Sequence, residues 1–182
     1  MGTYINIGNA GFQSARNSEY VDKSGLIAVV NSTLYTKRRF SCVTRCRRFG
    51  KSMAAEMLCA YYDQSCDSRS LFSDLEIAND PLFEKHLNKY PVIYLDMSDF
   101  VTRFKDETIV RKMDKELVED IHKTYSDVPI DENDDLMKYT GHCVGIEIQS
   151  GCRYGYLSDP QEAISCKGGR VHRRVVVSRN QL

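Results

Sequence analysis

The chain has 182 residues, of which 42% are hydrophobic and 27% are charged, so it suits one domain with a buried core or a piece of a larger protein. Its 25 basic residues balance its 25 acidic ones. Net charge therefore gives no argument for a nucleic-acid or membrane-surface partner.

The cysteine pattern and the absence of long apolar stretches bound the class of protein. Seven cysteines occur, an odd number with no C-x-x-C pair, so both a secreted disulfide framework and a zinc site are poorly supported. No apolar stretch approaches the ~20 residues that span a bilayer, and the N-terminus lacks a signal pattern. The sequence predicts a soluble cytoplasmic protein with reduced thiols.

The first third of the chain predicts short helices. Residues 1–19 are polar with scattered apolar anchors, and one helical turn is expected near residues 12–16. Asp22 or Ser24 can cap a helix that follows over residues 26–30. Residues 31–39 read as a connection with some strand character.

An apolar strand, a basic loop and a helix follow in that order. The strand is expected over residues 40–43, and the helix, with an apolar stripe, over residues 53–62. Between them, Gly50-Lys51-Ser52 fits the end of the phosphate-loop pattern G-x-x-x-x-G-K-[ST]. Lys51 would reach the terminal phosphates and Ser52 would be a Mg²⁺ ligand. Arg45 stands at the pattern's first glycine, so a plain helix start with a basic residue remains an alternative.

The middle of the chain predicts a helix, a strand and a second helix. A helix is expected over residues 81–89, a buried strand over residues 92–96, and an amphipathic helix over residues 106–125. The strand ends in Asp96, at the edge of the sheet where ligands of open α/β proteins bind. On pattern alone, Asp96 is a candidate Walker B carboxylate that holds Mg²⁺.

The character of the sequence changes near residue 139. The last part holds three cysteines, several glycines and a basic tail, with a candidate strand at residues 175–177. The acidic run at residues 131–135 is expected to be a solvated loop. We expect the chain to be a fragment, a degenerate copy or a product with an altered end, for example through a frame shift.

Several motifs together resemble one family. The segment R-C-R-R-F-G-K-S at residues 45–52 is similar to the R-P-R-R-F-G-K-[ST] segment of the bacterial AAA-ATPase-like family, whose members often carry a PD-(D/E)XK nuclease-like domain after the ATPase region. Stretches at residues 11–16, 20–24 and 90–98 agree in order and spacing. The resemblance covers about residues 7–100, and Cys46 departs from it, since the family usually has proline there.

The resemblance implies an α/β fold, namely a P-loop NTPase-like three-layer sandwich with a mostly parallel sheet, incomplete on its C-terminal side. It implies a partial AAA-ATPase-like domain over residues 1–138 and leaves residues 139–182 as an atypical tail, expected to be irregular or disordered. It also implies ATP and Mg²⁺ as cofactors. The strand at residues 92–96 would be an early strand, and the family's own Walker B segment is not found.

The candidate site residues fall into three groups. Lys51 and Asp96 are the catalytic candidates, and Ser52 and Asp96 are the Mg²⁺ candidates. The resemblance places Tyr20, Asp22 and Lys23 near the nucleotide base. The remaining cofactor-binding candidates belong to the loop: Arg45, Arg47, Arg48, Phe49 and Gly50, whose arginines can neutralise phosphate or contact solvent and acidic partners.

Two other functions remain open. The basic segment at residues 37–51, with Tyr35, Phe40 and Phe49 interleaved, is a candidate nucleic-acid-binding surface. An inactive protein-interaction remnant is the other. Because no secure Walker B segment is present, the sequence supports nucleotide binding better than hydrolysis.

Overall fold

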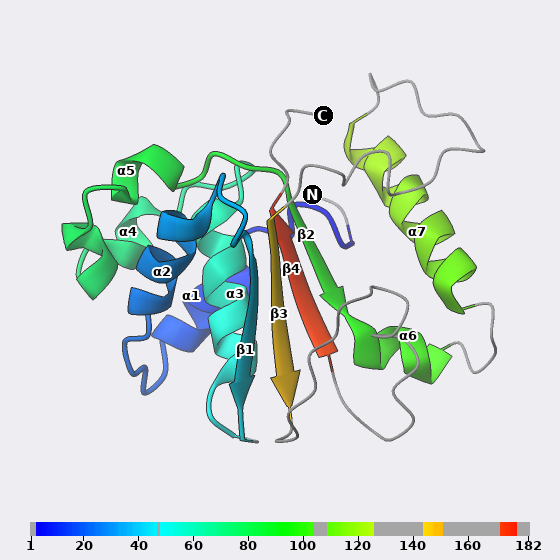
Figure 1. Cartoon of the computed structure of the whole chain (residues 1–182), viewed down its shortest axis with the longest axis horizontal. Coiled ribbons are helices and arrows are strands. Elements are labelled where there is room, and N and C mark those ends of the chain that lie inside the picture. The colour runs from blue at the N-terminus through cyan, green and yellow to red at the C-terminus, as the bar shows by residue number, and fades with distance from the viewer. Residues whose placement is uncertain (1–2, 47, 104–108, 126–143, 151–171, 178–182) are drawn as a thin grey trace.

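The computed structural model of the chain describes residues 3–46, 48–103, 109–125, 144–150 and 172–177. These residues form an open sheet with helices packed beside it (Figure 1). Along the chain, its elements are α1 (Ala10–Arg16), α2 (Gly25–Thr33), β1 (Phe40–Arg45), α3 (Lys51–Tyr62), α4 (Arg69–Phe72), η1 (Glu76–Asn79), α5 (Phe83–His86), β2 (Val92–Asp96), α6 (Met97–Arg103), α7 (Ile109–Thr124), β3 (Val144–Ser150) and β4 (His172–Val177).

The sheet has the strand order β1-β3-β4-β2. Strands β1 and β3 are parallel, with Phe40 opposite Gly145, whereas β4 is antiparallel to both of its neighbours. The expected mostly parallel sheet is therefore corrected to a mixed one. The physical reason is that an antiparallel strand starts at the end of the sheet where its predecessor stops, and needs no crossover. The strands β1, β2 and β3 still share one direction, so their carboxyl ends lie at one edge of the sheet.

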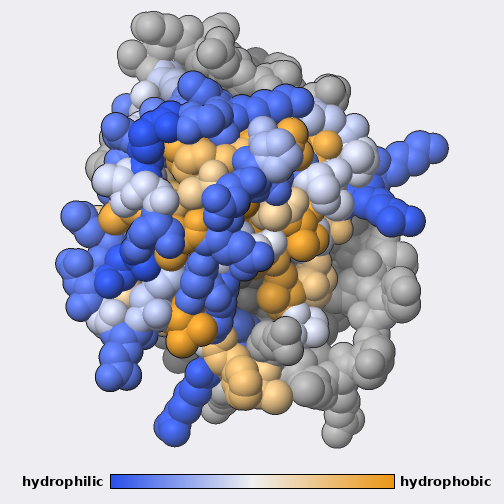
Figure 2. Space-filling view, turned by 90° about the vertical axis from the view of Figure 1, so that its left-hand side faces the viewer, coloured by the Kyte–Doolittle hydropathy of each residue, from blue (hydrophilic) through white to orange (hydrophobic). Residues whose placement is uncertain are grey.

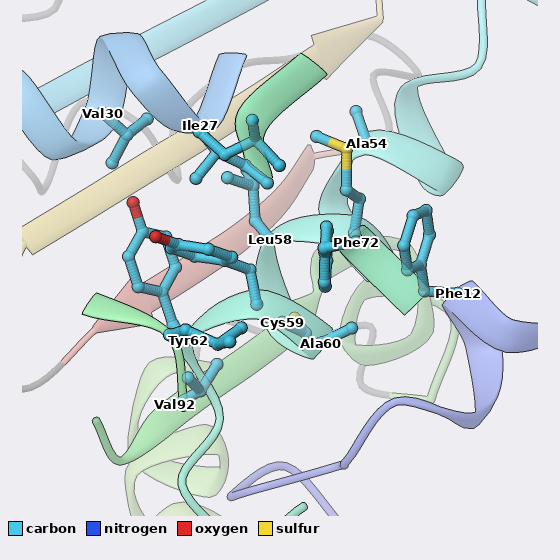
Figure 3. Packing of buried hydrophobic residues seen from close by; sticks show 14 of the residues in the cluster. Phe12, Ile27, Val30, Ala54, Leu58, Cys59, Ala60, Tyr62, Phe72 and Val92 are labelled. Carbon is cyan, nitrogen blue, oxygen red and sulfur yellow. The ribbon is translucent and has the colours of Figure 1, made fainter. Parts of the chain in front are cut away.

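Helix α3 lies at the centre of the larger core cluster. It contacts α1 as well as strands β2, β3 and β4, and most of its length is buried (Figure 3). Its Leu58 and Tyr62 pack with Ile27 and Val30 of α2, and with Phe72 of α4. The predicted apolar stripe is confirmed, and the buried surface is wider than one stripe because α3 packs against helices and the sheet together.

A second cluster lies on the opposite face of β2. Alternate residues of a strand point to opposite faces, and here Val92 belongs to the α3 cluster while Ile93 and Leu95 belong to the second one. That second cluster includes Phe100 of α6 and Leu117 of α7. Helices thus cover both faces at β2, and this mixed helix-and-strand arrangement is compatible with the expected α/β class.

The N-terminal segment covers the outer edge of β2. The backbone N–H of Tyr94 donates to the carbonyl of Tyr4 at 2.8 Å, and that of Asn6 donates to the carbonyl of Val92 at 2.8 Å. The Asn6 side-chain oxygen also accepts from the N–H of Val92 at 2.9 Å. An edge strand with free backbone groups is a template for aggregation, and this pairing removes part of that exposure.

A buried carboxylate holds this segment in place. Asp120 of α7 is only 4% exposed, and it accepts hydrogen bonds from three successive backbone N–H groups. The distances are 2.9 Å from Thr3, 2.8 Å from Tyr4 and 3.0 Å from Ile5. A buried charge is tolerated when it is satisfied in this way, so α7 and the N-terminal segment are linked by one side chain.

The surface over α1, α2, α4 and α5 carries no single continuous apolar patch. Figure 2 shows hydrophobic residues on this side of the molecule interrupted by hydrophilic ones. Single exposed hydrophobic residues are normal in soluble proteins. The large hydrophobic side chains that are exposed in the described parts of the chain are Val21, Val29, Tyr35, Phe40 and Phe49.

A buried histidine predicts acid sensitivity. The Nδ1 atom of His86 and the hydroxyl of Tyr90 are 2.6 Å apart, and that hydroxyl is 2.6 Å from the hydroxyl of Tyr35. Burial lowers the pKa of His86 and the nearby Lys85 lowers it further, while Asp80 opposes the shift. The unfolded chain, with an ordinary histidine pKa of about 6.5, then binds a proton before the folded chain does.

We therefore expect the folded state to be fully stabilised above pH 6.5 or so and to lose stability as the pH falls below that value, by at most about 1.4 kcal/mol per pH unit from this group. Urea unfolding between pH 5 and pH 8 measures the effect. His86→Gln should flatten the profile, and exchange of the exposed His122 for glutamine is the control. A profile unchanged in His86→Gln would show that another group is responsible.

After residue 125, the structure describes only the strands β3 and β4. The predicted strand at residues 175–177 is confirmed within β4, and β3 and β4 lie in the same sheet as β1 and β2. The division of the chain at residue 138 stays a prediction. The predicted acidic loop at residues 131–135 lies outside the described residues, as do residues 139–143 and 151–171. None of the described helices combines the length and apolar character that a membrane crossing requires.

Candidate functional site

The loop between β1 and α3 depends on a glycine in a left-handed conformation. Gly50 precedes the first residue of α3 and has φ +71° and ψ +28°. A Cβ atom at this position would lie 2.5 Å from Nζ of Lys23. Arg48, with φ +67°, also adopts a positive φ. Only glycine adopts this conformation without steric cost, so Gly50 fixes how tightly the chain turns into α3.

The start of α3 presents donors to this loop. Gly50 offers no side chain, and no side-chain hydrogen bond caps the helix. The N–H groups of a helix's first turn have no hydrogen-bond partner within the helix, and they carry partial positive charge. Ser52 belongs to this first turn and is half-buried. This donor set suits a phosphate group.

Lys51 folds back across the loop. Its Nζ donates a short hydrogen bond to the carbonyl oxygen of Cys46, five residues earlier. Lys23 reaches the same loop from the turn before α2, where its Nζ donates to the carbonyl oxygen of Phe49 at 2.9 Å. Two ammonium groups from distant parts of the sequence thus contact the five-residue connection between β1 and α3, residues 46–50.

The side chain of Asp22 binds backbone groups at the starts of α2 and η1, whereas that of Lys23 binds the loop. Its Oδ1 accepts from the N–H of Ser24 at 2.7 Å, and its Oδ2 accepts from the N–H of Glu76 at 2.8 Å. Burial by itself would raise the pKa of Asp22, but hydrogen bonds from Glu76 and Ser24, together with the charge of Arg16, outweigh it and lower that pKa. Asp22 therefore joins the start of α2 to η1, and Ser24 occupies the N-cap position without a capping hydrogen bond.

A cavity of about 290 Å³ lies between the segment before α2 and the loop. The hydroxyl of Tyr20 donates to Sδ of Met57 at 3.4 Å across part of it. Its lining combines a charged part with a larger hydrophobic part. The residues that line it are Glu19, Tyr20, Val21, Lys23, Arg48, Phe49, Gly50, Met53, Ala54 and Met57.

The structure thus brings together segments that the sequence analysis took separately, and comparison with known families agrees with their combination. A family model described as a predicted AAA-ATPase matches residues 6–148, from the N-terminal segment into β3. The chain belongs to the AAA-ATPase-like family. No curated protein and no solved structure matches it. Membership supports an ATPase-like domain and implies nucleotide use.

The arginines of this AAA-ATPase-like loop are placed unequally. Arg45 is the last residue of β1 and pairs with Ser150 of β3. Arg48 and Phe49 line the cavity, and Phe49 is 61% exposed. Arg47 lies outside the described residues.

Asp96 is not brought to the loop. It ends β2, and two strands separate β2 from β1, which corresponds to about 14 Å at the usual strand spacing. Strand β3, next to β1, ends in Gln149 and Ser150 and places no carboxylate at that end. Among the described residues, no group of three His, Cys, Asp or Glu side chains is arranged to hold a metal ion.

Sequence patterns missed part of the cavity. Glu19 and Val21 were not among the candidates, and Met53 and Met57 were expected only in the core. The signal was present, since Met53 and Met57 are four residues apart on the helix that starts at Lys51, and such residues share one face. Nothing in the sequence showed that this face reaches the segment before α2.

Proposed function

We propose that this chain binds a nucleoside triphosphate, ATP with Mg²⁺, at the loop of residues 45–52, in a sheet-and-helix layer arrangement of the P-loop NTPase type. One observation carries the proposal. The carboxyl end of β1, a left-handed Gly50 and the start of α3 meet at a turn that Lys51 and Lys23 both contact. Family membership supports the same reading.

The phosphates would occupy the start of α3. The N–H groups of its first turn would hold phosphate oxygens, and Lys51 would exchange the Cys46 carbonyl for the terminal phosphates. The charge of a phosphate makes it a stronger acceptor for an ammonium group than a neutral carbonyl. The Ser52 hydroxyl would be the protein's ligand to Mg²⁺, which takes few protein ligands and keeps several waters.

The base would enter the hydrophobic part of the cavity. Tyr20, Val21, Met53 and Met57 supply apolar lining there. The cavity volume of about 290 Å³ lies just below the ~300–1,000 Å³ range of small-molecule sites. This agrees with the expectation that Tyr20 lies near the base, whereas the side chain of Asp22 is engaged with backbone N–H groups and has a positioning role.

Binding, and not turnover, is the function that we propose for the described residues. Hydrolysis needs a carboxylate close to the Mg²⁺ ion, and two strands separate β2, which ends in Asp96, from β1, which leads into the loop. Asp96 remains the only sequence-predicted carboxylate for this role. The separation of β2 from β1 in the sheet argues against direct contact of Asp96 with a Mg²⁺ ion at Ser52 in this arrangement.

Titration of the chain with Mg²⁺ and ATP tests the proposal. We expect Lys51→Ala to weaken ATP binding at least tenfold, since a hydrogen bond between charged groups contributes roughly 1.5–3 kcal/mol. Lys37→Ala is the matched control, because it removes the same charge from an exposed position before β1. Calorimetric titration gives the affinities, and circular dichroism verifies folding. A folded wild-type chain that does not bind ATP would refute the proposal.

A nucleic-acid-binding surface is the second candidate function. The aromatic residues interleaved with the basic segment are exposed as such a surface requires: Tyr35 by 47%, Phe40 by 66% and Phe49 by 61%. The Arg39 guanidinium lies 5.1 Å from the centre of the Phe40 ring. Salt-sensitive binding of a single-stranded oligonucleotide, without nucleotide binding, would favour this candidate.

A further inference from the structure

We propose that Lys23 is a second phosphate-binding lysine of this site, which acts together with Lys51 on the phosphates of the nucleotide. The inference rests on the proposed function and deepens it, because the resemblance to the family placed Lys23 near the base. It assigns to the turn before α2 a contact with the charged end of the ligand.

The first argument is position. The Nζ atom of Lys23 lies 2.9 Å from the Phe49 carbonyl oxygen and 2.5 Å from where a Cβ atom of Gly50 would be. The glycine therefore makes room for the ammonium group of Lys23 at the residue just before α3. Lys23 also lines the cavity together with Arg48.

The second argument is charge. The hydrogen-bond partner of Lys23 is a neutral carbonyl in an exposed setting. Among the described residues, no carboxylate forms an ion pair with Lys23. The ammonium charge at Gly50 is thus not neutralised by a carboxylate there. Hydrogen bonds of ammonium to phosphate are stronger than those to a neutral carbonyl, so an anionic ligand gains from this arrangement.

The third argument is rigidity of the turn that carries Lys23. The neighbouring Asp22 binds two backbone N–H groups, one of them from Glu76 of η1. The Ser24 hydroxyl accepts from the N–H of Ile77 at 3.1 Å, and Ser24 is fully buried. The main chain on either side of Lys23 is therefore fixed against η1, which limits the freedom that its side chain loses when it binds a ligand.

The two lysines contact the two ends of one loop. Lys51 bonds to the carbonyl of Cys46, and Lys23 bonds to that of Phe49. A phosphate chain at the start of α3 offers both ammonium groups charged acceptors in exchange for neutral ones. The contribution of Lys23 should then grow with the number of phosphates on the ligand.

The test compares Lys23→Met, Lys23→Gln and the control Lys37→Met in the full chain. Dissociation constants are measured with Mg²⁺ for AMP, ADP, ATP and tripolyphosphate, and for adenosine without it. We expect Lys23→Met to weaken ATP and tripolyphosphate binding by about tenfold or more. The loss should be smaller for ADP, smaller again for AMP, and absent for adenosine. Lys23→Gln keeps a hydrogen-bond donor without the charge, and it should follow Lys23→Met.

The other possible results separate the role of Lys23 from the proposed function. Equal losses for adenosine and ATP would show that Lys23 only shapes the cavity. Unchanged ATP affinity in the folded Lys23 variants, with affinity lost in Lys51→Ala, would overturn the role of Lys23 and leave the proposed function standing. Absence of ATP binding in the wild-type chain would overturn both. If Lys23→Met does not fold, Lys23→Gln decides, and ATP affinity equal to the wild type in that variant would refute a role for the charge.

Discussion

Replacing Asp120 with alanine is expected to lower the free energy of unfolding by about 3–5 kcal/mol. The change deletes one carboxylate but leaves the backbone N–H groups of Thr3, Tyr4 and Ile5 without their acceptor. The Ile5 group is buried and water cannot replace the lost hydrogen bond there, while the other two are partly buried. Domains have a total stability of only ~5–15 kcal/mol, so this loss is a large fraction.

Urea unfolding of Asp120→Ala and Glu119→Ala measures the effect. Glu119 is the preceding residue of α7 and is exposed, so its removal should change stability by no more than about 0.5 kcal/mol. Asp120→Asn keeps the shape but turns one acceptor into a donor that faces N–H groups, and we expect it to be nearly as destabilising as alanine. Equal midpoints for Asp120→Ala and Glu119→Ala would contradict the role of the buried carboxylate.

Replacing Gly50 with valine is expected to weaken nucleotide binding more than tenfold and to destabilise the fold by about 1–3 kcal/mol. A β-branched residue is strained at the positive φ of this position. Its Cβ atom would also displace the ammonium group of Lys23 from the Phe49 carbonyl. The turn into α3 then opens or shifts, and the first-turn N–H groups lose their alignment.

Gly25→Ala is the matched control for this variant. Gly25 begins α2 in an ordinary backbone conformation, and a Cβ atom there would meet the Glu76 carboxylate at 3.6 Å, an ordinary contact. Alanine should therefore be neutral or slightly stabilising at that position. ATP titration and urea unfolding of both variants give the two readouts. A Gly50→Val chain that binds ATP like the wild type would show that the loop's conformation is not needed for binding.

The elements with a strong local pattern were predicted well from the sequence. Strand β2 occupies the expected residues, and α3 and α7 agree with the expected helices apart from their ends. Their apolar spacing carries the information within a few residues. The expected helix at residues 81–89 is only the short α5, Phe83–His86, because Leu87 adopts an extended backbone and Asn88 has a positive φ.

The connection after α2 shows where burial overrides local pattern. The expected strand character at residues 31–39 is not found, because α2 continues to Thr33. Asn31 is buried in that helix, and its amide bonds to the hydroxyls of Tyr61 and Tyr62 at 3.1 and 2.8 Å. A polar residue in a core helix is satisfied only by partners distant in the sequence, and these leave no trace in the local pattern.

In the candidate site too, local features were predictable from the sequence and contacts between distant segments were not. The loop itself was predictable because a phosphate loop is a local motif, and the structure adds the left-handed Gly50. The approach of Lys23 to that loop spans 26 residues, and only the resemblance to the family connected the two segments. The distance from Asp96 to the loop depends on strand order, which the residues of β2 do not encode. The three valines of β4 are equally compatible with either strand direction.

The anchoring of the N-terminal segment has a consequence for synthesis of the chain. The acceptor for the backbone N–H groups of residues 3–5 lies 115–117 residues later in the sequence. At ~5–20 residues per second, Asp120 is added roughly 6–23 s after Ile5. During that interval, residues 3–5 have no carboxylate to hold them. The nascent chain therefore depends on other interactions, or on a chaperone, until α7 has been made.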